Sequence, residues 1–171
     1  MKIISLASLL LLSISLYSQG VLVYPKNYDE KKYLSITDTS SADKLTEKLP
    51  VLFEEISNYM NEHHLEHTAP AFTIYHQFTP EQVICEVAFP INQEVKGNDR
   101  IRYKIMPAGK ALVADFYGHY LRLQTAHRMV QEEIVRRKAT QTGPSWEEYI
   151  THPAAEPDPE KWLTKVWYPI E

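Results

Sequence analysis

The chain has 171 residues and a formal net charge of −4, with 44% hydrophobic and 23% charged residues. This is an ordinary globular composition, which excludes a disordered chain, a collagen-like chain and a repeat array. The acidic balance argues against nucleic acid as a partner. A single cysteine, Cys85, excludes an internal disulfide and any multi-cysteine metal site. Eleven tyrosines and three tryptophans are many for this length, and an aromatic-lined pocket would account for them.

The first 20 residues have the pattern of a secretory signal peptide. Lys2 precedes an uncharged run of apolar and serine residues from Ile3 to Leu16, which is shorter than the roughly 20 residues that a membrane-spanning helix needs. Small residues at Ser18 and Gly20 predict cleavage after one of the two. We therefore expect a periplasmic or secreted protein that has no contact with the membrane after cleavage. The alternative is an uncleaved N-terminal membrane anchor.

Two sequence blocks recur in the same order, which indicates an internal duplication. Residues 68–75 align with residues 142–149 at an offset of 74 positions, and residues 87–91 align with residues 166–170 at an offset of 79. The growth of the offset is explained by a longer second hairpin loop, rich in proline and acidic residues, at residues 152–160.

Each half predicts a strand, a helix and a two-stranded hairpin, and the second half opens with one additional segment at 101–106. Hydrophobic spacing predicts helices from about Glu47 to His64 and from about Tyr120 to Lys138. The predicted strands are 32–37, 72–76, 83–89, 101–106, 111–117, 146–150 and 163–168. The expected fold class is α+β, in which pseudo-duplicated strand–helix–strand–strand units form a curved antiparallel sheet. Two helices would lie on one face of this sheet and a ligand cleft on the other.

We expect a single domain over residues 21–171, with halves at about 31–91 and 101–171. Within its last hairpin, strand alternation makes Trp146 and Ile150 the natural helix-facing pair. Glu147 and Tyr149 are then expected to point to the open face.

The duplication adds residues of the first half to this candidate site. Thr73 and Tyr75 occupy the positions that match Glu147 and Tyr149. Tyr117, at the end of a predicted strand, is a further candidate for the wall of the cleft. A carboxylate among tyrosines at the junction of two related halves is a plausible ligand site.

The chemistry of such a carboxylate leaves several uses open. Partial burial penalises an unpaired charge, so a cationic ligand that pairs with Glu147 gains binding energy. Desolvation could instead raise the pKa of the carboxyl until it serves as a general acid or base, with Tyr149 orienting the reacting group. The third reading is a surface glutamate on a solvated strand.

Several segments resemble the GyrI-like (gyrase-inhibitor-like) small-molecule-binding domains, which also serve as effector-binding domains of AraC-type regulators. They are Gly-Pro-Ser-Trp-Glu-Glu-Tyr at 143–149, Met-Pro-Ala-Gly-Lys at 106–110 and Thr-Lys-Val-Trp-Tyr-Pro at 164–169. The resemblance covers about residues 31–171. It implies the duplicated fold described above and a pocket for amphipathic, often cationic or aromatic compounds. It also places Glu147 and Tyr149 at the family's pocket glutamate and tyrosine.

The family that this chain resembles includes free-standing proteins that hydrolyse strained electrophiles. In this chain about a dozen residues separate the signal peptide from the first predicted strand, so no helix-turn-helix domain is expected and transcriptional regulation and gyrase inhibition are disfavoured. The leading hypothesis is an exported, free-standing protein that binds amphipathic cationic or aromatic compounds. A hydrolase of strained or genotoxic small molecules that uses Glu147, and a module that docks a protein partner, are the alternatives.

No cofactor is expected. His63 and His67 have the i, i+4 spacing of metal ligands, but no carboxylate is arranged to complete a site, so no metal is expected either. The sequence does not decide which of Trp167 and Tyr168 faces the cleft, because neighbouring residues on a strand point to opposite faces.

Overall fold

The computed structural model describes residues 21–171, so the predicted signal peptide lies outside the described residues. Within that range no helix is long and apolar enough to cross a membrane. The helices are α1 (Leu45–Glu62) and α2 (Gln124–Arg137), with short 3-10 helices η1 (Ala42–Lys44), η2 (Tyr120–Arg122) and η3 (Pro159–Lys161). The strands are β1 (Leu22–Tyr28), β2 (Lys31–Ser40), β3 (Phe72–Phe78), β4 (Val83–Pro90), β5 (Arg102–Met106), β6 (Gly109–Tyr117), β7 (Ser145–Tyr149) and β8 (Leu163–Pro169).

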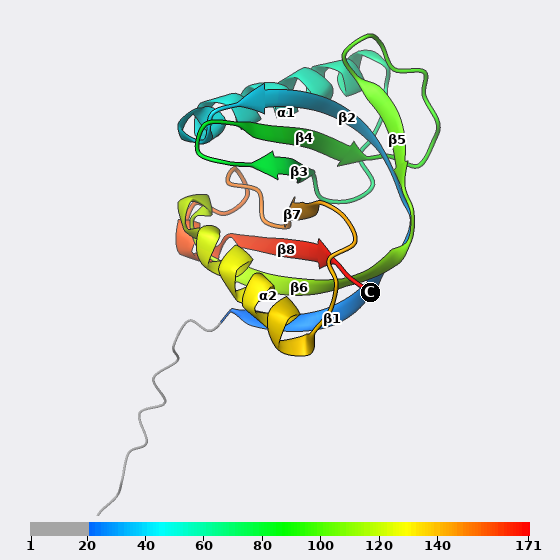
Figure 1. The fold of residues 1–171 in the computed structure, drawn as a ribbon. Helices are drawn as coiled ribbons and strands as arrows, with labels where there is room; N and C mark the ends of the chain where they lie inside the picture. The colour runs from blue at the N-terminus through cyan, green and yellow to red at the C-terminus, as the bar shows by residue number, and fades with distance from the viewer. Residues whose placement is uncertain (1–20) are drawn as a thin grey trace, which may run out of the picture.

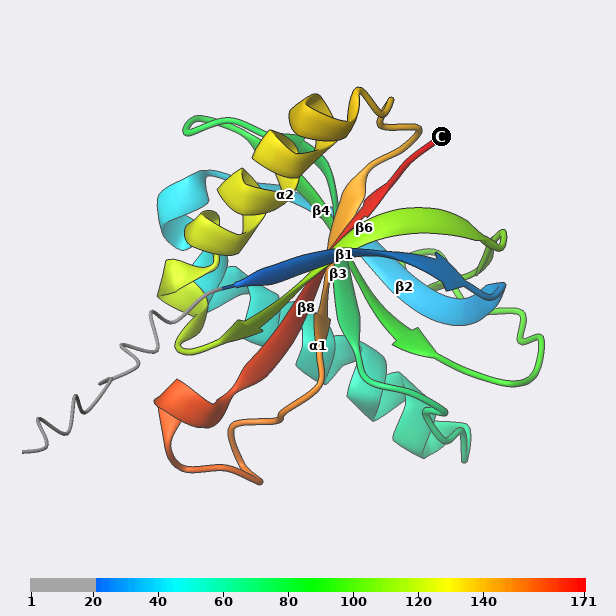
Figure 2. The same ribbon diagram turned by 90° about the horizontal axis from the view of Figure 1, so that it is seen from below.

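All the described strands form one antiparallel sheet in the order β1-β6-β8-β7-β3-β4-β2-β5. The order is symmetric about the β7–β3 pair, so β1-β2-α1-β3-β4 and β5-β6-α2-β7-β8 are repeated units, which confirms the predicted duplication. The first strand of each unit pairs with a strand of the other unit, since β1 pairs with β6 and β5 pairs with β2. Figure 1 shows the stacked strands, and Figure 2 shows them fanning out about the centre of a strongly twisted sheet.

The sequence patterns did not predict β1. The strand follows directly after the predicted signal peptide and contains Pro25, which removes one backbone donor. A proline is tolerated in a strand at the edge of a sheet, and β1 occupies such an edge.

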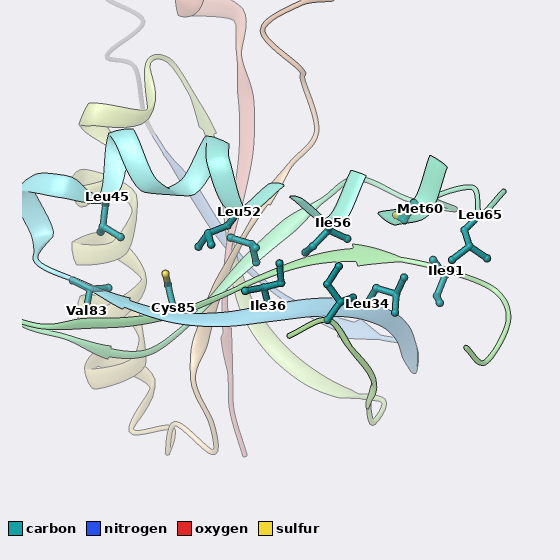
Figure 3. Close-up of a cluster of buried hydrophobic side chains, with 12 residues drawn as sticks. Leu34, Ile36, Leu45, Leu52, Ile56, Met60, Leu65, Val83, Cys85 and Ile91 are labelled. Carbon is teal, nitrogen blue, oxygen red and sulfur yellow. The ribbon is translucent and has the colours of Figure 1, made fainter. Parts of the chain in front are cut away.

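Both helices cover the same face of the sheet. α1 packs on β2 and β4, and α2 packs on β6 and β8. Figure 3 shows the apolar stripe of α1, including Leu52 and Ile56, directed at Leu34 and Ile36 of β2. Each helix therefore covers the outer strands of its own half, and the central strands β3 and β7 lie uncovered between the two helices.

The opposite face of the central strands carries an aromatic cluster. The Trp146 and Trp167 rings stack with centroids 5.4 Å apart, and the Tyr28 ring of β1 meets Trp146 edge-on at 5.1 Å. The prediction that Trp146 faces the helices is therefore wrong, because Trp146 lies on the other face. The physical reason is that the sheet curls, so that Tyr28 of β1 packs on Trp146 and covers it in place of a helix. Ile150 lies beyond the end of β7 with 37% of its surface exposed, and it borders the space between the two helices.

Candidate ligand-binding site

A cleft of about 1920 Å³ lies between α1 and α2, with residues of β3 and β7 in its floor. The curved antiparallel sheet and its two helices are as predicted, but the cleft was expected on the face opposite the helices and lies on the same face. The reason is the arrangement of the two halves. Because each helix covers the outer strands of its own half, the helices form walls and leave the central pair uncovered between them.

Glu147 lies at the centre of this floor. Glu147 is 6% exposed, and on β7 it lies directly opposite Thr73 of β3. Carboxylate atom Oε2 accepts hydrogen bonds from the hydroxyls of Tyr75 at 2.9 Å and Tyr149 at 2.8 Å. Atom Oε1 lies 2.8 Å from His127 Nε2 of α2. Three donors from three elements therefore hold one buried carboxylate.

The two tyrosines are fixed as hydrogen-bond donors. Burial, together with the nearby charge of Glu147, raises the pKa values of Tyr75 and Tyr149 well above 10. Both phenols therefore keep their protons at physiological pH. The Tyr149 and Thr73 hydroxyl oxygens lie 3.1 Å apart, and since the single Tyr149 proton is directed to Glu147, the Thr73 hydroxyl supplies the proton of this contact. Thr73 is fully buried beneath the cleft and positions Tyr149.

Sequence patterns missed His127, although it touches Glu147. Its Nδ1 atom lies 2.9 Å from the hydroxyl of Tyr168 on β8, which also accepts a hydrogen bond of 3.3 Å from Gln131. Tyr168, rather than Trp167, therefore lines the cleft. A signal was present in the sequence, because the offset of 74 positions pairs His127 with Phe53, which borders the apolar stripe of the first helix.

Aromatic rings form a continuous wall from one end of the cleft to the first helix. The Tyr120 ring lies 4.8 Å from Trp162 and 5.5 Å from Tyr149. Phe53 continues the series, 5.8 Å from Tyr149 and 5.6 Å from Phe89. Tyr120, where the sequence predicts the start of the second helix, lines the cleft. These rings offer a broad apolar surface with π-faces beside Glu147.

The charges around the cleft are of one sign. Its lining contains the carboxylates of Glu147 and Glu54 and no lysine or arginine, as far as residues 21–171 are concerned. Five of the seven histidines also line it. They are His67, His76, His119, His127 and His152.

Tyr117 was predicted as a wall residue, but the structure does not bring it to the cleft; Thr73, fully buried, is also absent from the lining. Tyr117 lies at the end of β6 with 60% of its surface exposed. Alternation along β6 turns Phe116 toward α2, so Tyr117 points the other way. No group of three or more potential metal ligands lies together within the described part of the chain.

Comparison with known proteins places this geometry among related folds. The sequence profile of the GyrI-like small molecule binding domain matches residues 31–171. The crystal structure of the EcmrR C-terminal domain superposes with a TM-score of 0.79 at 21% identity, covering 88% of this chain and 98% of that one. In an EcmrR–DNA complex, this chain spans only 57% of the EcmrR chain.

Two more distant structures share the fold. The structure of SAV2435 bound to tetraphenylphosphonium has a TM-score of 0.62 at 13% identity, covering 88% of this chain and 94% of that one. A hydrolase from Listeria innocua has a TM-score of 0.63 at 10% identity, covering 91% and 94%. A search of curated protein sequences finds no significant match. Because the family profile spans most of the chain, including both walls and the floor of the cleft, this chain belongs to the GyrI-like small molecule binding domain family.

Proposed function

We propose that the protein is exported and captures amphipathic cations that carry aromatic or bulky apolar groups. The observation that supports the proposal most directly is the environment of the Glu147 carboxylate. Its carboxylate is buried and held by two tyrosine hydroxyls and a histidine, in a cleft whose described lining has no lysine or arginine. Within residues 21–171, Glu147 therefore has no permanently positive partner, and a ligand can supply one.

The energetics favour a cation with apolar substituents. A buried carboxylate without a counter-charge is costly, so a ligand cation that approaches it recovers electrostatic energy in a region of low dielectric. The aromatic wall formed by Phe53, Tyr120, Tyr149 and Trp162 adds contacts to both parts of such a ligand. Each cation–π contact contributes roughly 0.5 to 2 kcal/mol when it is desolvated.

The size of the cleft and one structural neighbour support this ligand class. Ligand pockets commonly have volumes of about 300 to 1,000 Å³, so a cleft of about 1920 Å³ suits a bulky ligand. SAV2435, whose fold is similar, was solved with tetraphenylphosphonium, a cation surrounded by four aromatic rings. We extend that ligand class to this chain on the basis of Glu147 and the aromatic wall.

Calorimetric titration of the purified protein with tetraphenylphosphonium tests the proposal. We expect saturable binding to the wild type and a loss of at least tenfold in affinity for Glu147→Gln, because the amide keeps the shape and removes the charge. Glu148→Gln is the matched control, since Glu148 is equally buried but lies on the opposite face, paired with Lys31 at 3.0 Å. Neutral triphenylphosphine oxide should bind the wild type and Glu147→Gln alike. Equal affinity of both proteins for the cation would contradict the proposal.

A second function is favoured by one contact, the 2.8 Å approach of His127 to Glu147. A carboxylate and an imidazole in contact form an acid–base pair, which could activate water against a strained electrophile. Incubation with an epoxide-bearing aromatic compound, followed by mass spectrometry, separates the two functions. A hydrated product formed by the wild type and not by Glu147→Gln would establish a hydrolase. Retention of unaltered cations alone would support capture.

Export is tested separately from ligand binding. We expect a C-terminally tagged chain expressed in a bacterium to appear in the periplasmic or extracellular fraction. Its mature N-terminus should follow Ser18 or Gly20. A full-length N-terminus in the membrane fraction would indicate the uncleaved anchor instead.

A further inference from the structure

We infer that His127 makes cation capture dependent on pH, because a proton on His127 and a cationic ligand compete for the single charge of Glu147. This inference rests on the proposed function. It concerns how the site is regulated, and it assigns a role to a residue that sequence patterns did not single out.

The hydrogen bonds of His127 suit both protonation states of its ring. Nε2 lies 2.8 Å from a carboxylate oxygen of Glu147, which only accepts, so Nε2 carries a proton in either state. Nδ1 lies 2.9 Å from the hydroxyl of Tyr168, which donates to a neutral ring and accepts from a protonated one. Nδ1 therefore keeps a hydrogen bond to Tyr168 in both protonation states of the ring.

Glu147 is the charged group in direct contact with His127. Around the ring, β7 contributes Glu147, β8 contributes Tyr168, and β3 contributes Tyr75, whose ring centroid lies 6.2 Å away. Burial raises the pKa values of Tyr75 and Tyr168 above 10, so both stay neutral where histidines titrate. On α2 itself, Gln131 is neutral and reaches the same Tyr168 hydroxyl.

The other charged and titratable groups of the cleft act at longer range. Glu54 is exposed on α1, and no lysine or arginine belongs to the described lining. Of the other four histidines of the lining, none makes a described contact with Glu147, and His76 is paired with Glu86 at 2.7 Å. Among the histidines of the lining, His127 is thus the one whose ring contacts the Glu147 carboxylate.

The consequence follows from charge balance. A protonated His127 and Glu147 form an ion pair of zero net charge, which leaves nothing for a ligand cation to neutralise. A neutral His127 leaves the carboxylate with its full charge. Since the cation binds the form with neutral His127, binding releases the proton, and protonation weakens binding by the same factor. Apparent affinity then falls with the competent fraction, by up to about tenfold per pH unit.

Tetraphenylphosphonium is the appropriate probe because its charge does not change with pH. Titrations between pH 8 and pH 5 should show at least a tenfold weakening for the wild-type protein. His127→Gln should bind with nearly constant affinity over this range, since its amide can still donate to Glu147 but does not titrate. The matched control is His63→Gln, a histidine outside the cleft lining, which should keep the wild-type dependence. Triphenylphosphine oxide should bind independently of pH.

A measurement without any mutation supplies a second test. Calorimetry of the wild type in two buffers of different ionisation enthalpy should show release of up to one proton per bound cation at pH 6. No proton release would overturn the inference, because binding would then be linked to no titrating group. A pH dependence that persists in His127→Gln would also overturn it and would assign the titration to Glu147 itself or to other histidines. Failure of the proposed function has a different signature, namely no binding of the cation at pH 8 or binding that Glu147→Gln leaves unchanged.

Discussion

The two halves of the cleft have the same scaffold and different chemistry. Residues at equivalent positions face each other across the central strands, at the offsets of 74 and 79 positions found in the sequence. The pairs are Phe53 and His127, Thr73 and Glu147, Tyr75 and Tyr149, and Phe89 and Tyr168. Even the contacts are repeated: Phe53 meets Tyr149 at 5.8 Å, and His127 meets Tyr75 at 6.2 Å.

The comparison shows how a duplicated fold acquires a polar site. The first half kept apolar or neutral side chains at these positions, whereas the second half carries the carboxylate, the imidazole and an additional phenol. Thr73 and Glu147 are cross-strand partners, so the axis that relates the halves passes between them. A carboxylate placed there is within reach of a tyrosine from each half. The duplication therefore supplies two donors to one acceptor.

Making the two helix cores alike should have the largest effect. Leu52 is buried under α1, and its counterpart on α2 is Ala126. Leu52→Ala copies the second half into the first and leaves a cavity under α1, because Leu52 is buried and its neighbours relax only partly. We expect a loss of about 3 kcal/mol in the free energy of unfolding, measured by urea denaturation. A loss below about 1 kcal/mol would show that α1 collapses onto the sheet.

Making the two central strands alike should abolish the electrostatic difference between the halves. Glu147→Thr copies the residue at position 73 and removes the carboxylate from the cleft floor. We expect tetraphenylphosphonium affinity to fall by about thirtyfold, or about 2 kcal/mol, as for a desolvated charge partner.

The exchange variant sharpens the same test. Thr73→Glu combined with Glu147→Thr moves the carboxylate to the first half, beside Phe53 instead of His127. Because a tyrosine from each half still reaches the axis, we expect most of the cation affinity to return, without the pH dependence. A double variant as weak as Glu147→Thr alone would show that the halves are not interchangeable.

On the face opposite the cleft, equivalent positions of the two halves carry opposite charges, and each charge belongs to an ion pair. Glu86 is 1% exposed and contacts Lys104 Nζ at 2.8 Å and His76 Nε2 at 2.7 Å. Its counterpart at an offset of 79 is Lys165, which pairs with Asp115 at 2.6 Å. Burial acts to raise the pKa of Glu86, but the hydrogen bonds from Lys104 and His76 outweigh burial and lower it below 4.5.

The sign of the resulting pH effect follows directly. A carboxyl whose pKa is lower in the folded than in the unfolded state stabilises the fold above the unfolded value, and this contribution is lost as the pH falls through the folded value. Glu86→Gln should therefore be less stable than the wild type by about 1 to 2 kcal/mol at pH 7. The difference should shrink as the pH is lowered below 4.5. Urea denaturation at pH 7 and pH 3.5 measures both values, and a constant difference would contradict this account.

The smallest effects should separate a tyrosine inside the cleft from one outside it. Tyr149→Phe removes one of the two hydroxyls that donate to Glu147 Oε2, so we expect cation affinity to fall by about fivefold, or about 1 kcal/mol. Tyr117→Phe alters an exposed residue outside the lining and should leave affinity unchanged within twofold. An equal loss in both variants would place Tyr117 against the ligand.

Local patterns were sufficient for most of the fold. Hydrophobic spacing predicted both helices, β-prone runs between turn signals predicted seven of the strands, and internal repetition predicted their arrangement in two related units. The strand that escaped prediction, β1, is held by its pairing with β6 in the other half, which no local pattern reveals. Its Pro25 even argued against a strand.

For the site, the sequence by itself determined that Glu147 and Tyr149 share one face of a strand and that Tyr75 and Thr73 match them. Strand alternation and repetition are properties of neighbouring residues, so they can be read before folding. Only the tertiary structure decided which face that is, because it depends on how the sheet curls and on which strands the helices cover. The same long-range packing brought His127 to Glu147 and turned Tyr117 away from the cleft.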